Sequence, residues 1–412
     1  MRIAYLCCDF GIPVGGEKGA ALHVRELCRA LRSLGHEVLL VTPRAAGAGS
    51  MDSSLAVEEL PLEPVEEIAY HLLRTDPGGG PLVAGELRAT LYAAVLRHRA
   101  VSLLKNFGPD LVYERYSLFG TAGAALAREL GVPFFLEVNA PLSEEHARHR
   151  GLTFAATAEG LERIVLCSAD RVIAISPEIE RWVVELGVEP ARVTILPNAV
   201  DVERFERADG DRAAVRAGLG LVGRPLVGFL GTLKPWHGTE SLVRAVALLH
   251  RRGSGPHLLL VGDGPERQAL EDLALREGIA GAMTCVGSVP NERVPAYLAA
   301  VDVAAAPYPA LEKFYFSPLK LYEYLAAGRP VVAADVGQIG HCVQPGQTGH
   351  LYAPGDVEGL AAALAAVLED SETASALGRA GREHVRAQHT WEGNARAVVE
   401  LARAELSRAR AA

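Results

Sequence analysis

The sequence predicts an α/β protein with two doubly wound, Rossmann-like domains. At 412 residues the chain is longer than one hydrophobic core usually supports, so two domains are the default expectation. Short apolar runs rich in Val, Ile and Leu alternate with amphipathic helical patterns, which is typical of a parallel sheet. The same alternation starts again near Arg224, and this repetition favours two domains over one large sheet.

The first domain is expected to cover residues 1–198 and to begin directly with a buried strand, RIAYLCC. A glycine-rich loop and an amphipathic helix, AALHVRELCRALRSLG, follow this strand. Further apolar runs predict the remaining strands, HEVLLVTP, PDLVYERY, VPFFLEVN, RVIAIS and VTILP. The AAGAGS and PGGGP segments between Ala45 and Gly80 predict mobile loops around a short acidic section.

The second domain is expected over residues 199–385, after a turn at Pro197-Asn198-Ala199. Its predicted strands are RPLVGFLG, HLLLVGDG, MTCVGSV, VDVAAAPY and RPVVAAD, with helical patterns between them. Helical periodicity continues to residue 406 and breaks near Thr390-Trp391. Residues 386–412 therefore predict a terminal helix, which we expect to brace the first domain.

Composition and charge exclude several classes of protein. The formal net charge of −9 argues against a nucleic-acid-binding protein. The chain has no run of about 18 apolar residues, and its start, MRIAYLCCDFG, lacks the parts of a signal peptide, so we expect a cytoplasmic protein. The six cysteines show no C-x-x-C spacing and no histidines at zinc-site intervals, which favours small buried side chains in a reducing compartment.

The segment Ser317–Val332, SPLKLYEYLAAGRPVV, is the most informative part of the sequence. Gly328 followed by Pro330 predicts the end of a short helix. Apolar side chains at helical spacing predict its packing face, Leu319, Tyr322, Leu325 and Ala326. Glu323 then lies in the middle of a packed helix, where a carboxylate is costly unless it has a partner. A structural ion pair and a carboxylate that receives two sugar or ribose hydroxyls both fit this pattern.

A glycine-rich turn follows the first strand of each domain. In the first turn, Gly15 and Gly16 precede a helix, where backbone amides favour an anion, although a turn that needs positive φ explains them equally well. The second turn, Gly231–Gly238, places Lys234 and His237 at the carboxyl end of a strand, where ligands of open α/β sheets bind. Both side chains are candidates for phosphate binding, and a solvated lysine beside a packed tryptophan is the alternative.

Taken in chain order, these motifs resemble the family 4 glycosyltransferases of the two-domain GT-B type, over nearly the whole chain. The matching segments are the Gly-Gly loop with His23, VTILPNAVDVERF, GFLGTLKPWHG, LLLVGDGPER, VGSVPNERVPAYLAAVDVAAAP and KLYEYLAAGRPVVA. The resemblance implies two Rossmann-like domains facing across a cleft, with a nucleotide-sugar donor on the second and an acceptor on the first. It also implies sugar transfer with retention of configuration, without a cofactor or metal ion.

The resemblance assigns roles to individual residues. Glu323 matches the second glutamate of the family's paired-glutamate motif and would bind the donor ribose; with Lys234 and Asn139 it forms the expected catalytic set. Asn139 stands where the family often has a histidine, and it can orient a sugar hydroxyl but cannot act as a general base. The other donor-binding residues implied are Gly15, Gly16, Thr232, His237, Gly262, Val289, Tyr315, Phe316, Ser317, Lys320 and Leu321.

Two departures from the family pattern concern the donor. Tyr315 stands at the position of the family's first glutamate, so the transferred sugar would meet backbone amides or hydroxyls there. Thr232 and His237 stand where the family often has an arginine and a lysine. Lys234 and Lys320 would then supply the phosphate charge. No Asp-x-Asp pair is found, and we expect helix N-termini and lysines to stabilise the diphosphate without a metal.

Two other functions fit the same architecture. A sugar-nucleotide 2-epimerase would act on the donor itself. A catalytically inactive sugar-nucleotide-binding protein is favoured by Tyr315 and Asn139. Within the transferase interpretation, the acceptor is a sugar, a lipid or a natural product.

A helix expected over Glu86–Lys105 raises the question of peripheral membrane contact at the inner face of the membrane. It combines apolar residues with cations that can meet an anionic bilayer: Leu87, Leu91, Val95, Leu103 and Leu104, with Arg88, Arg97, Arg99 and Lys105. We prefer packing on the sheet, because this stripe leads directly into the core strand PDLVYERY.

Overall fold

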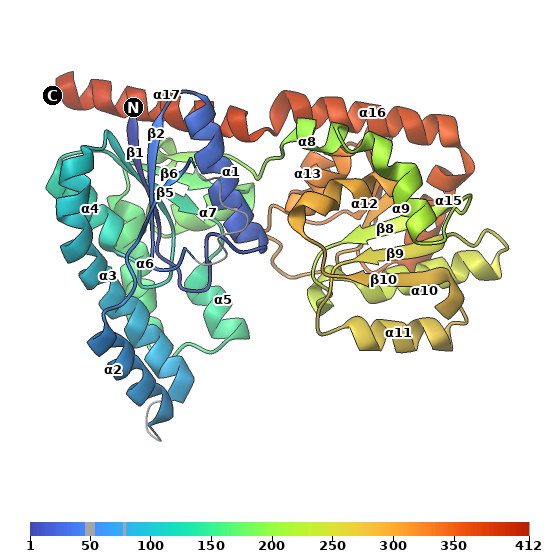
Figure 1. Cartoon of the computed structure of the whole chain (residues 1–412), viewed down its shortest axis with the longest axis horizontal. Helices are drawn as coiled ribbons and strands as arrows, with labels where there is room; N and C mark the ends of the chain where they lie inside the picture. The colour runs from blue at the N-terminus through green and yellow to red at the C-terminus, as the bar shows by residue number, and fades with distance from the viewer. Residues whose placement is uncertain (46–53, 77–79, 412) are drawn as a thin grey trace. The chain divides into compact units, whose positions relative to one another are not determined.

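The computed structural model describes residues 1–45, 54–76 and 80–411, and the chain divides into two compact units (Figure 1). Unit 1 comprises Met1–Pro197 and Trp391–Ala412, and unit 2 comprises Asn198–Thr390. The division lies one residue before the boundary expected from the sequence. The chain returns to unit 1 at Trp391 rather than at residue 386.

Unit 1 contains, among its described residues, a seven-stranded sheet in the order β3-β2-β1-β4-β5-β6-β7. All neighbouring strands pair in parallel. The strand order reverses between β1 and β4, and ligands of open α/β sheets bind at such a point, outside the carboxyl ends of the strands. The strands are β1 (Arg2–Cys7), β2 (Glu37–Thr42), β3 (Ala56–Glu59), β4 (Leu111–Arg115), β5 (Phe134–Val138), β6 (Arg171–Ala174) and β7 (Val193–Ile195).

The helices of unit 1 include the C-terminal helix of the chain. That helix packs against α1, where the rings of His23 and Trp391 meet edge to face with centroids 4.8 Å apart. It also supplies Glu405, whose Oε1 accepts a hydrogen bond from Arg171 Nε of β6 at 2.7 Å. The helices are α1 (Gly19–Ser33), α2 (Pro64–Thr75), α3 (Gly80–Phe107), α4 (Ala122–Leu130), α5 (Leu142–His149), α6 (Ala155–Ser168), α7 (Pro177–Glu185) and α17 (Trp391–Ala411).

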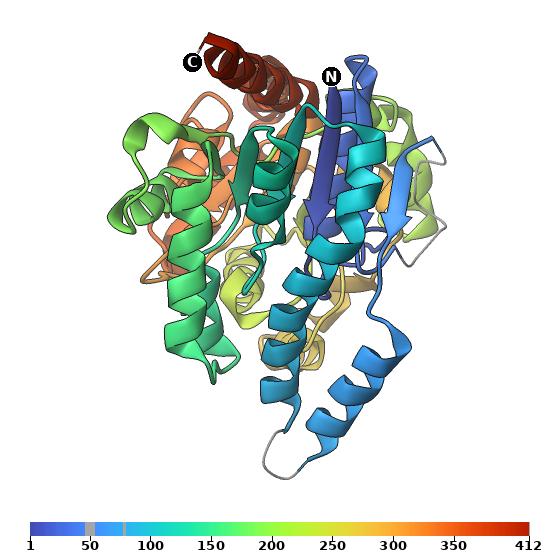
Figure 2. The same cartoon turned by 90° about the vertical axis from the view of Figure 1, so that its left-hand side faces the viewer.

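The segment between β2 and α3, expected to consist of loops, contains β3 and α2. β3 is the edge strand beside β2, and α2 lies alongside α3 (Figure 2). At the start of α2, the backbone amide of Glu63 donates to Glu66 Oε2 at 2.6 Å, and Pro64 occupies the first turn. The expectation was wrong here because the glycine-rich flanks outweighed the short pattern PVEEIAYHLL. Residues 46–53 and 77–79 of the expected mobile loops lie outside the described residues.

Helix α3 is longer than the helix expected from the sequence, and a different face of it is buried. Of the expected apolar set only Leu104 is fully buried, whereas Leu91 is 54% exposed. The buried face consists instead of Ala84, Tyr92, Ala93, Leu96, Ala100 and Leu104. Two of the cations of the alternative membrane interpretation, Arg97 and Lys105, pair with Glu129 of α4 with N–O distances of 3.6 and 3.1 Å. These cations are therefore engaged within unit 1.

Unit 2 contains, over the described residues, a six-stranded parallel sheet in the order β10-β9-β8-β11-β12-β13. The strands are β8 (Leu226–Leu230), β9 (His257–Val261), β10 (Met283–Gly287), β11 (Val303–Ala306), β12 (Val331–Ala334) and β13 (Gly349–Tyr352). β13 was not expected from the sequence, because GHLY is short and mixes polar with apolar residues.

The helices of unit 2 surround this sheet, and all but α9, which packs in a small separate cluster with α12, contribute buried residues to the main apolar core. They are α8 (Val202–Glu206), α9 (Arg212–Gly218), α10 (Thr239–Arg251), α11 (Arg267–Arg276), α12 (Val294–Ala300), α13 (Leu319–Ala326), α14 (Ile339–Cys342), α15 (Val357–Glu369) and α16 (Ser371–Gln388). Both units are thus parallel α/β structures of Rossmann type, and the predicted fold class is confirmed.

Candidate functional site

Glycines shape the two turns at the carboxyl edge of the unit 2 sheet. Gly231, after β8, has a φ of 131°, and a Cβ there would lie 3.0 Å from Lys320 Nζ. Gly262, after β9, has a φ of 140°, and a Cβ there would lie 2.1 Å from the Gly231 carbonyl oxygen. Only glycine fits both positions. The β8 turn carries the exposed Thr232, and Lys234, whose Nζ lies 4.6 Å from the ring centroid of Trp236.

Helix α13 is buried on nearly all sides rather than along one stripe. The expected packing residues Tyr322, Leu325 and Ala326 are buried, and Leu319 is half-buried. Lys320, Leu321 and Tyr324 are buried as well. The sequence pattern underestimated this burial because it placed a lysine on the helix face that was expected to meet water.

Lys320 is a buried cation without a hydrogen-bond partner among the described residues. Its side chain is only 9% exposed, and Nζ lies 4.2 Å from the ring centroid of Phe229 and 5.4 Å from that of Tyr308. Burial lowers the pKa of Lys320 to about 7, although nearby Glu323 acts in the opposite direction. A desolvated ammonium that meets only aromatic rings is costly, so it marks a position where an anion can bind.

Glu323 lies three residues after Lys320 and therefore on the same face of α13. It is 8% exposed, and burial raises the pKa of its carboxyl, while Arg204 and Lys320 oppose this shift. Arg204 itself is held by Asn291, whose Oδ1 accepts a hydrogen bond from its guanidinium at 3.0 Å. One helix thus presents a cation and a carboxylate side by side, which suits a ligand that carries both an anionic group and hydroxyls.

His237 is uncharged at neutral pH. Burial and the nearby Lys320 and Lys234 lower the pKa of His237 to about 3, against the opposing hydrogen bond with Thr232. Its Nδ1 lies 2.5 Å from the Thr232 carbonyl oxygen, and it must carry the ring proton to donate there. Nε2 is then an acceptor and cannot bind phosphate. In this state Nε2 offers no proton to a phosphate, so the phosphate role expected for His237 stays a prediction, and the two lysines are the cationic candidates there.

The segment before α13 is aromatic and tightly held. The ring centroids of Tyr315 and Phe316 lie 4.4 Å apart, and the Phe316 carbonyl accepts a hydrogen bond from Gln338 at 2.7 Å. The Ser317 hydroxyl accepts the backbone amide of Asn198 at 2.9 Å. Ser317 thus ties the start of α13 to the start of unit 2 and positions the helix.

Two further expected donor contacts have side chains that face the core. Leu321 is completely buried, and Val289 is half-buried against the unit 2 core. If either residue touches a ligand, its backbone makes the contact.

In unit 1, the glycine-rich turn after β1 binds its own chain. The amide of Gly15 donates to the Ala45 carbonyl at 3.1 Å, and that of Gly16 donates to the Pro13 carbonyl at 2.8 Å. Each amide therefore already has a partner in the chain, and the expected share of these amides in diphosphate binding stays a prediction. Competition from nearby carbonyls is a tertiary effect that the glycine spacing does not reveal.

Asn139, just after β5, belongs to a buried network centred on Glu137. Its Nδ2 donates to Glu137 Oε1 at 2.6 Å. Glu137 is 1% exposed. Its carboxylate also accepts hydrogen bonds from Arg115 and Tyr113, both at 2.7 Å, and its Oε2 lies 2.8 Å from His23 Nε2. Burial alone would raise the pKa of Glu137, but these partners hold it well below its usual range. The network positions Asn139. The sequence analysis did not identify this network, although the charged residues inside the apolar runs LVYERY and FFLEVN were a signal of it.

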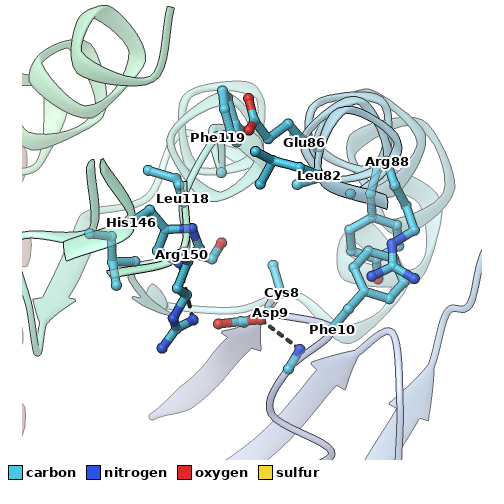
Figure 3. Close-up of a pocket in the computed structure, with 18 of the residues that line it drawn as sticks. Cys8, Asp9, Phe10, Leu82, Glu86, Arg88, Leu118, Phe119, His146 and Arg150 are labelled. Carbon is cyan, nitrogen blue, oxygen red and sulfur yellow. Dashed lines mark hydrogen bonds between the residues drawn. The ribbon is translucent and has the colours of Figure 1, made fainter. Parts of the chain in front are cut away.

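A pocket of about 230 Å³ lies in unit 1 at the carboxyl ends of β1 and β4, next to α3 (Figure 3). Figure 3 shows Leu82 and Phe119 on one side of it, and Asp9 and Arg150 on the other. Asp9 Oδ1 accepts the amide of Gly11 at 2.6 Å. The mixed lining suits a molecule with both hydroxyls and apolar ring faces.

Glu86 and Phe119 give this pocket its shape. The carboxylate of Glu86 accepts the amides of Thr153 and Phe154 at 2.7 and 2.8 Å, which fixes the connection between α5 and α6. Phe119 has a φ of 65°, an unusual value for a residue other than glycine. Sequence patterns gave no indication of either role.

Neither a membrane-spanning helix nor a cluster of metal-ligating side chains occurs in the described part of the chain. No helix there is both long and apolar enough to cross a membrane. Likewise, residues 1–45, 54–76 and 80–411 contain no group of three or more His, Cys, Asp or Glu side chains placed to hold a metal ion.

Comparison with known proteins matches both units to glycosyltransferase families. Residues 18–204 match the family described as "Glycosyltransferase Family 4", and residues 224–370 match "Glycosyl transferases group 1". A D-inositol 3-phosphate glycosyltransferase of Nocardia farcinica is 33% identical over 367 residues, 84% of this chain and 78% of the relative. Glycogen synthase of Mycobacterium tuberculosis is 28% identical over 97% of this chain and 94% of its own.

Solved structures share the fold. Sucrose-phosphate synthase of Thermosynechococcus elongatus aligns with a TM-score of 0.74 at 23% identity, covering 98% of this chain and 99% of that one. HepE of Anabaena, solved in complex with UDP, aligns with a TM-score of 0.73 at 21% identity, covering 97% and 99% of the two chains. At these identities the likeness establishes the architecture of the chain and not its substrates.

Proposed function

Since the chain belongs to the family 4 glycosyltransferases of the GT-B type, we propose that it transfers a sugar from a UDP- or GDP-sugar to a hydroxylated acceptor, with retention of configuration. One observation carries the donor part of this proposal: Lys320 and Glu323, both buried, lie on one face of α13. A nucleoside diphosphate has the anionic and hydroxyl groups that such a pair requires.

The proposed donor lies at the carboxyl edge of the unit 2 sheet. Its ribose hydroxyls donate to the Glu323 carboxylate, and its diphosphate meets the ammonium groups of Lys320 and Lys234. Bonds to ionised groups are stronger than neutral ones, and they gain further in a desolvated site. As the sugar departs, negative charge grows on the leaving diphosphate, and cations fixed beforehand stabilise that charge.

The proposed acceptor occupies the pocket of unit 1. The Asp9 carboxylate can accept its hydroxyls, while Leu82 and Phe119 cover apolar parts of a ring. Relatives named as acting on inositol phosphate or on a phosphatidylinositol mannoside support an acceptor with a compact hydroxylated ring, free or lipid-linked.

Retention follows if the acceptor hydroxyl attacks the anomeric carbon from the side that the diphosphate leaves. The carbon–oxygen bond to the acceptor forms as the bond to the diphosphate breaks, and the hydroxyl proton passes to the leaving phosphate oxygen. No protein nucleophile is invoked: Asn139 is an amide, and the nearby Glu137 carboxylate is occupied by side-chain hydrogen bonds. Asn139 is assigned to orienting a sugar hydroxyl.

The two alternatives considered from the sequence, a 2-epimerase and an inactive binding protein, are not favoured, because the relatives are named as transferases. Incubation with UDP- and GDP-sugars in deuterated buffer separates the three functions. We expect slow hydrolysis of one donor without an acceptor and no deuterium at C2 of the sugar. Deuterium at C2 would instead identify an epimerase, and nucleotide binding without any turnover would identify an inactive protein.

We also expect transfer to be independent of divalent metals, because Lys234 and Lys320 supply positive charge for the diphosphate. Activity after EDTA treatment and desalting should match that of the untreated enzyme, measured as donor hydrolysis. Mg²⁺ or Mn²⁺ should restore nothing. Loss of activity in EDTA that either ion reverses would contradict this assignment of the diphosphate site.

A further inference from the structure

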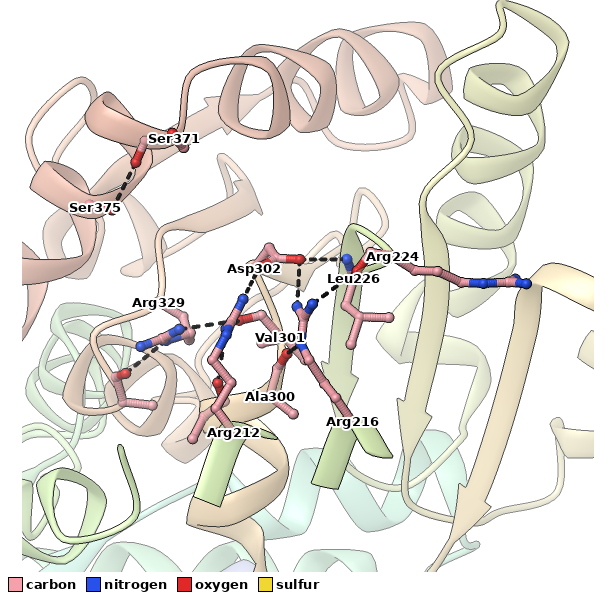
Figure 4. Close-up of polar contacts among 12 residues, drawn as sticks. Arg212, Arg216, Arg224, Leu226, Ala300, Val301, Asp302, Arg329, Ser371 and Ser375 are labelled. Atoms are coloured by element: carbon pink, nitrogen blue, oxygen red, sulfur yellow. Dashed lines mark hydrogen bonds and ion pairs between the residues drawn. The ribbon is translucent and has the colours of Figure 1, made fainter. Parts of the chain in front are cut away.

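Unit 2 holds a cavity that is larger than the pocket of unit 1. It lies at the edge of the unit 2 sheet opposite the candidate donor site. Its volume is about 650 Å³, within the range of small-molecule sites. Arg224, Asp302 and Arg329 line it and lie one or two residues before β8, β11 and β12, so the cavity lies at the amino ends of these strands. The first turns of α16 complete the wall with Ser371 and Ser375 (Figure 4).

The lining of this cavity is strongly cationic. It includes six arginines and two aspartates, an excess of four positive charges, in a chain whose formal net charge is −9. The arginines are Arg212, Arg216, Arg224, Arg329, Arg379 and Arg382. Such an excess around one cavity needs a counter-charge.

Half of these arginines have a structural partner that accounts for them. Arg212 and Arg216 both donate to Asp302, the latter at 2.7 Å, and also to carbonyls at the end of α12 (Figure 4). Arg382 forms a two-point contact with Asp209, both N–O distances being 2.8 Å. Both aspartates of the cavity are therefore already engaged.

The other three arginines lack a carboxylate partner within the described part of the chain. Arg329 bonds only to carbonyls, those of Ala327 and Val301 at 2.9 and 3.3 Å. Burial, together with repulsion from Arg212 and Arg382, lowers the pKa of Arg329 to about 10, against the attraction of the two aspartates. Arg224 and Arg379 are exposed and line the cavity.

We propose that this cavity binds a small molecule that carries at least two phosphate groups. The planar, forked guanidinium matches phosphate oxygens two at a time, and arginine stays charged at any physiological pH. A single phosphate would neutralise part of the excess of four charges, whereas two or more phosphates can balance it. The site is separate from the diphosphate site on α13, because the two occupy opposite ends of the same strands.

Titration calorimetry with inorganic tripolyphosphate tests this assignment. The variant R224Q/R379Q changes two exposed arginines whose side chains make no described hydrogen bond, so unit 2 should fold as before. We expect it to weaken tripolyphosphate binding at least tenfold. K320M should leave this binding component unchanged, since it alters only the donor site. Thermal unfolding of each variant checks its fold.

The matched control is R251Q/R276Q, which removes two exposed arginines of unit 2 away from the cavity. Equal weakening in this control, or unchanged affinity in R224Q/R379Q, would overturn the proposal. Co-sedimentation with vesicles that contain phosphatidylinositol 4,5-bisphosphate, a lipid with more than one phosphate group, separates two sources of the phosphates. Sedimentation that R224Q/R379Q abolishes assigns the cavity to a phosphorylated lipid head group, and tripolyphosphate binding without sedimentation assigns it to a free phosphorylated metabolite.

Discussion

Glu323→Gln is expected to weaken nucleotide binding about tenfold or more while the protein stays folded. A hydrogen bond to a charged group contributes about 1.5–3 kcal/mol, and about 1.4 kcal/mol corresponds to a factor of ten in affinity. Glutamine keeps the size and shape of the side chain, but it lacks the negative charge and replaces one of the two acceptor oxygens with an NH2 donor. Because the Glu323 carboxyl is buried and its pKa is raised, removal of its charge should cost no stability.

Calorimetric titration with UDP and with GDP measures this change, and unfolding curves verify the fold. Glu358→Gln serves as the matched control, because Glu358 is an exposed glutamate of the same unit. An unchanged dissociation constant in a folded Glu323→Gln protein would remove Glu323 from the donor site.

Lys320→Met is expected to have two opposite effects: a loss of nucleotide affinity of about tenfold to a hundredfold and a gain in stability. The affinity loss follows from the missing charged hydrogen bond to the diphosphate, worth about 1.5–3 kcal/mol. The stability gain follows because methionine fills similar space without a buried charge that lacks a hydrogen-bond partner among the described residues. A residue kept for packing would show losses of both kinds or of neither.

The same lysine should make nucleotide binding depend on pH. Burial brings the folded pKa of Lys320 to about 7, well below the value of an unfolded lysine. In the free enzyme the ammonium therefore loses its proton as pH rises through about 7, and affinity for a diphosphate should fall. Stability should move the other way: between the folded and unfolded pKa values the unfolded chain binds more protons, so the free energy of unfolding rises with pH.

The pH dependence of nucleotide affinity and of the free energy of unfolding is to be measured in wild type and in Lys320→Met. In the variant, the contribution of Lys320 to each should disappear. The comparison removes the titration of the nucleotide's own phosphate. Lys313→Met, a change at an exposed lysine of the preceding segment, is the control for charge alone. A pH profile that is identical in wild type and Lys320→Met would contradict the binding role.

Most strands of the two sheets, though not β3 and β13, and the position of the α13 helix were predictable because their signals are local. Runs such as LVGFL and VVAA are apolar over their whole length, as is typical of strands covered on both faces. Gly328 and Pro330 likewise define the end of α13 by backbone chemistry alone. Short elements with mixed composition, such as β13 and α2, lack such local signals, and their formation depends on neighbours that are distant in sequence.

The sequence predicted which residues form the candidate site, but not their charges or their hydrogen-bond partners. Glu323 was singled out because an acid in a packed helix is unusual, and the structure shows it buried. The charge of His237 and the availability of the Gly15 and Gly16 amides depend on which carbonyl lies within reach, and sequence spacing does not contain that information. For the same reason the sequence named Asn139 but not Glu137, the carboxylate that holds it.

The course of the chain through the two units has a consequence for how the protein is made. Unit 2 is one continuous stretch, whereas unit 1 needs both ends of the chain. A ribosome therefore releases a complete unit 2 before it has synthesised α17, which packs on α1. Until then His23 lacks Trp391, and Arg171 lacks Glu405, a partner 234 residues away. The last helix to be synthesised thus closes the first domain to begin folding, and a chain that stopped at Thr390 would leave unit 1 open to misassembly.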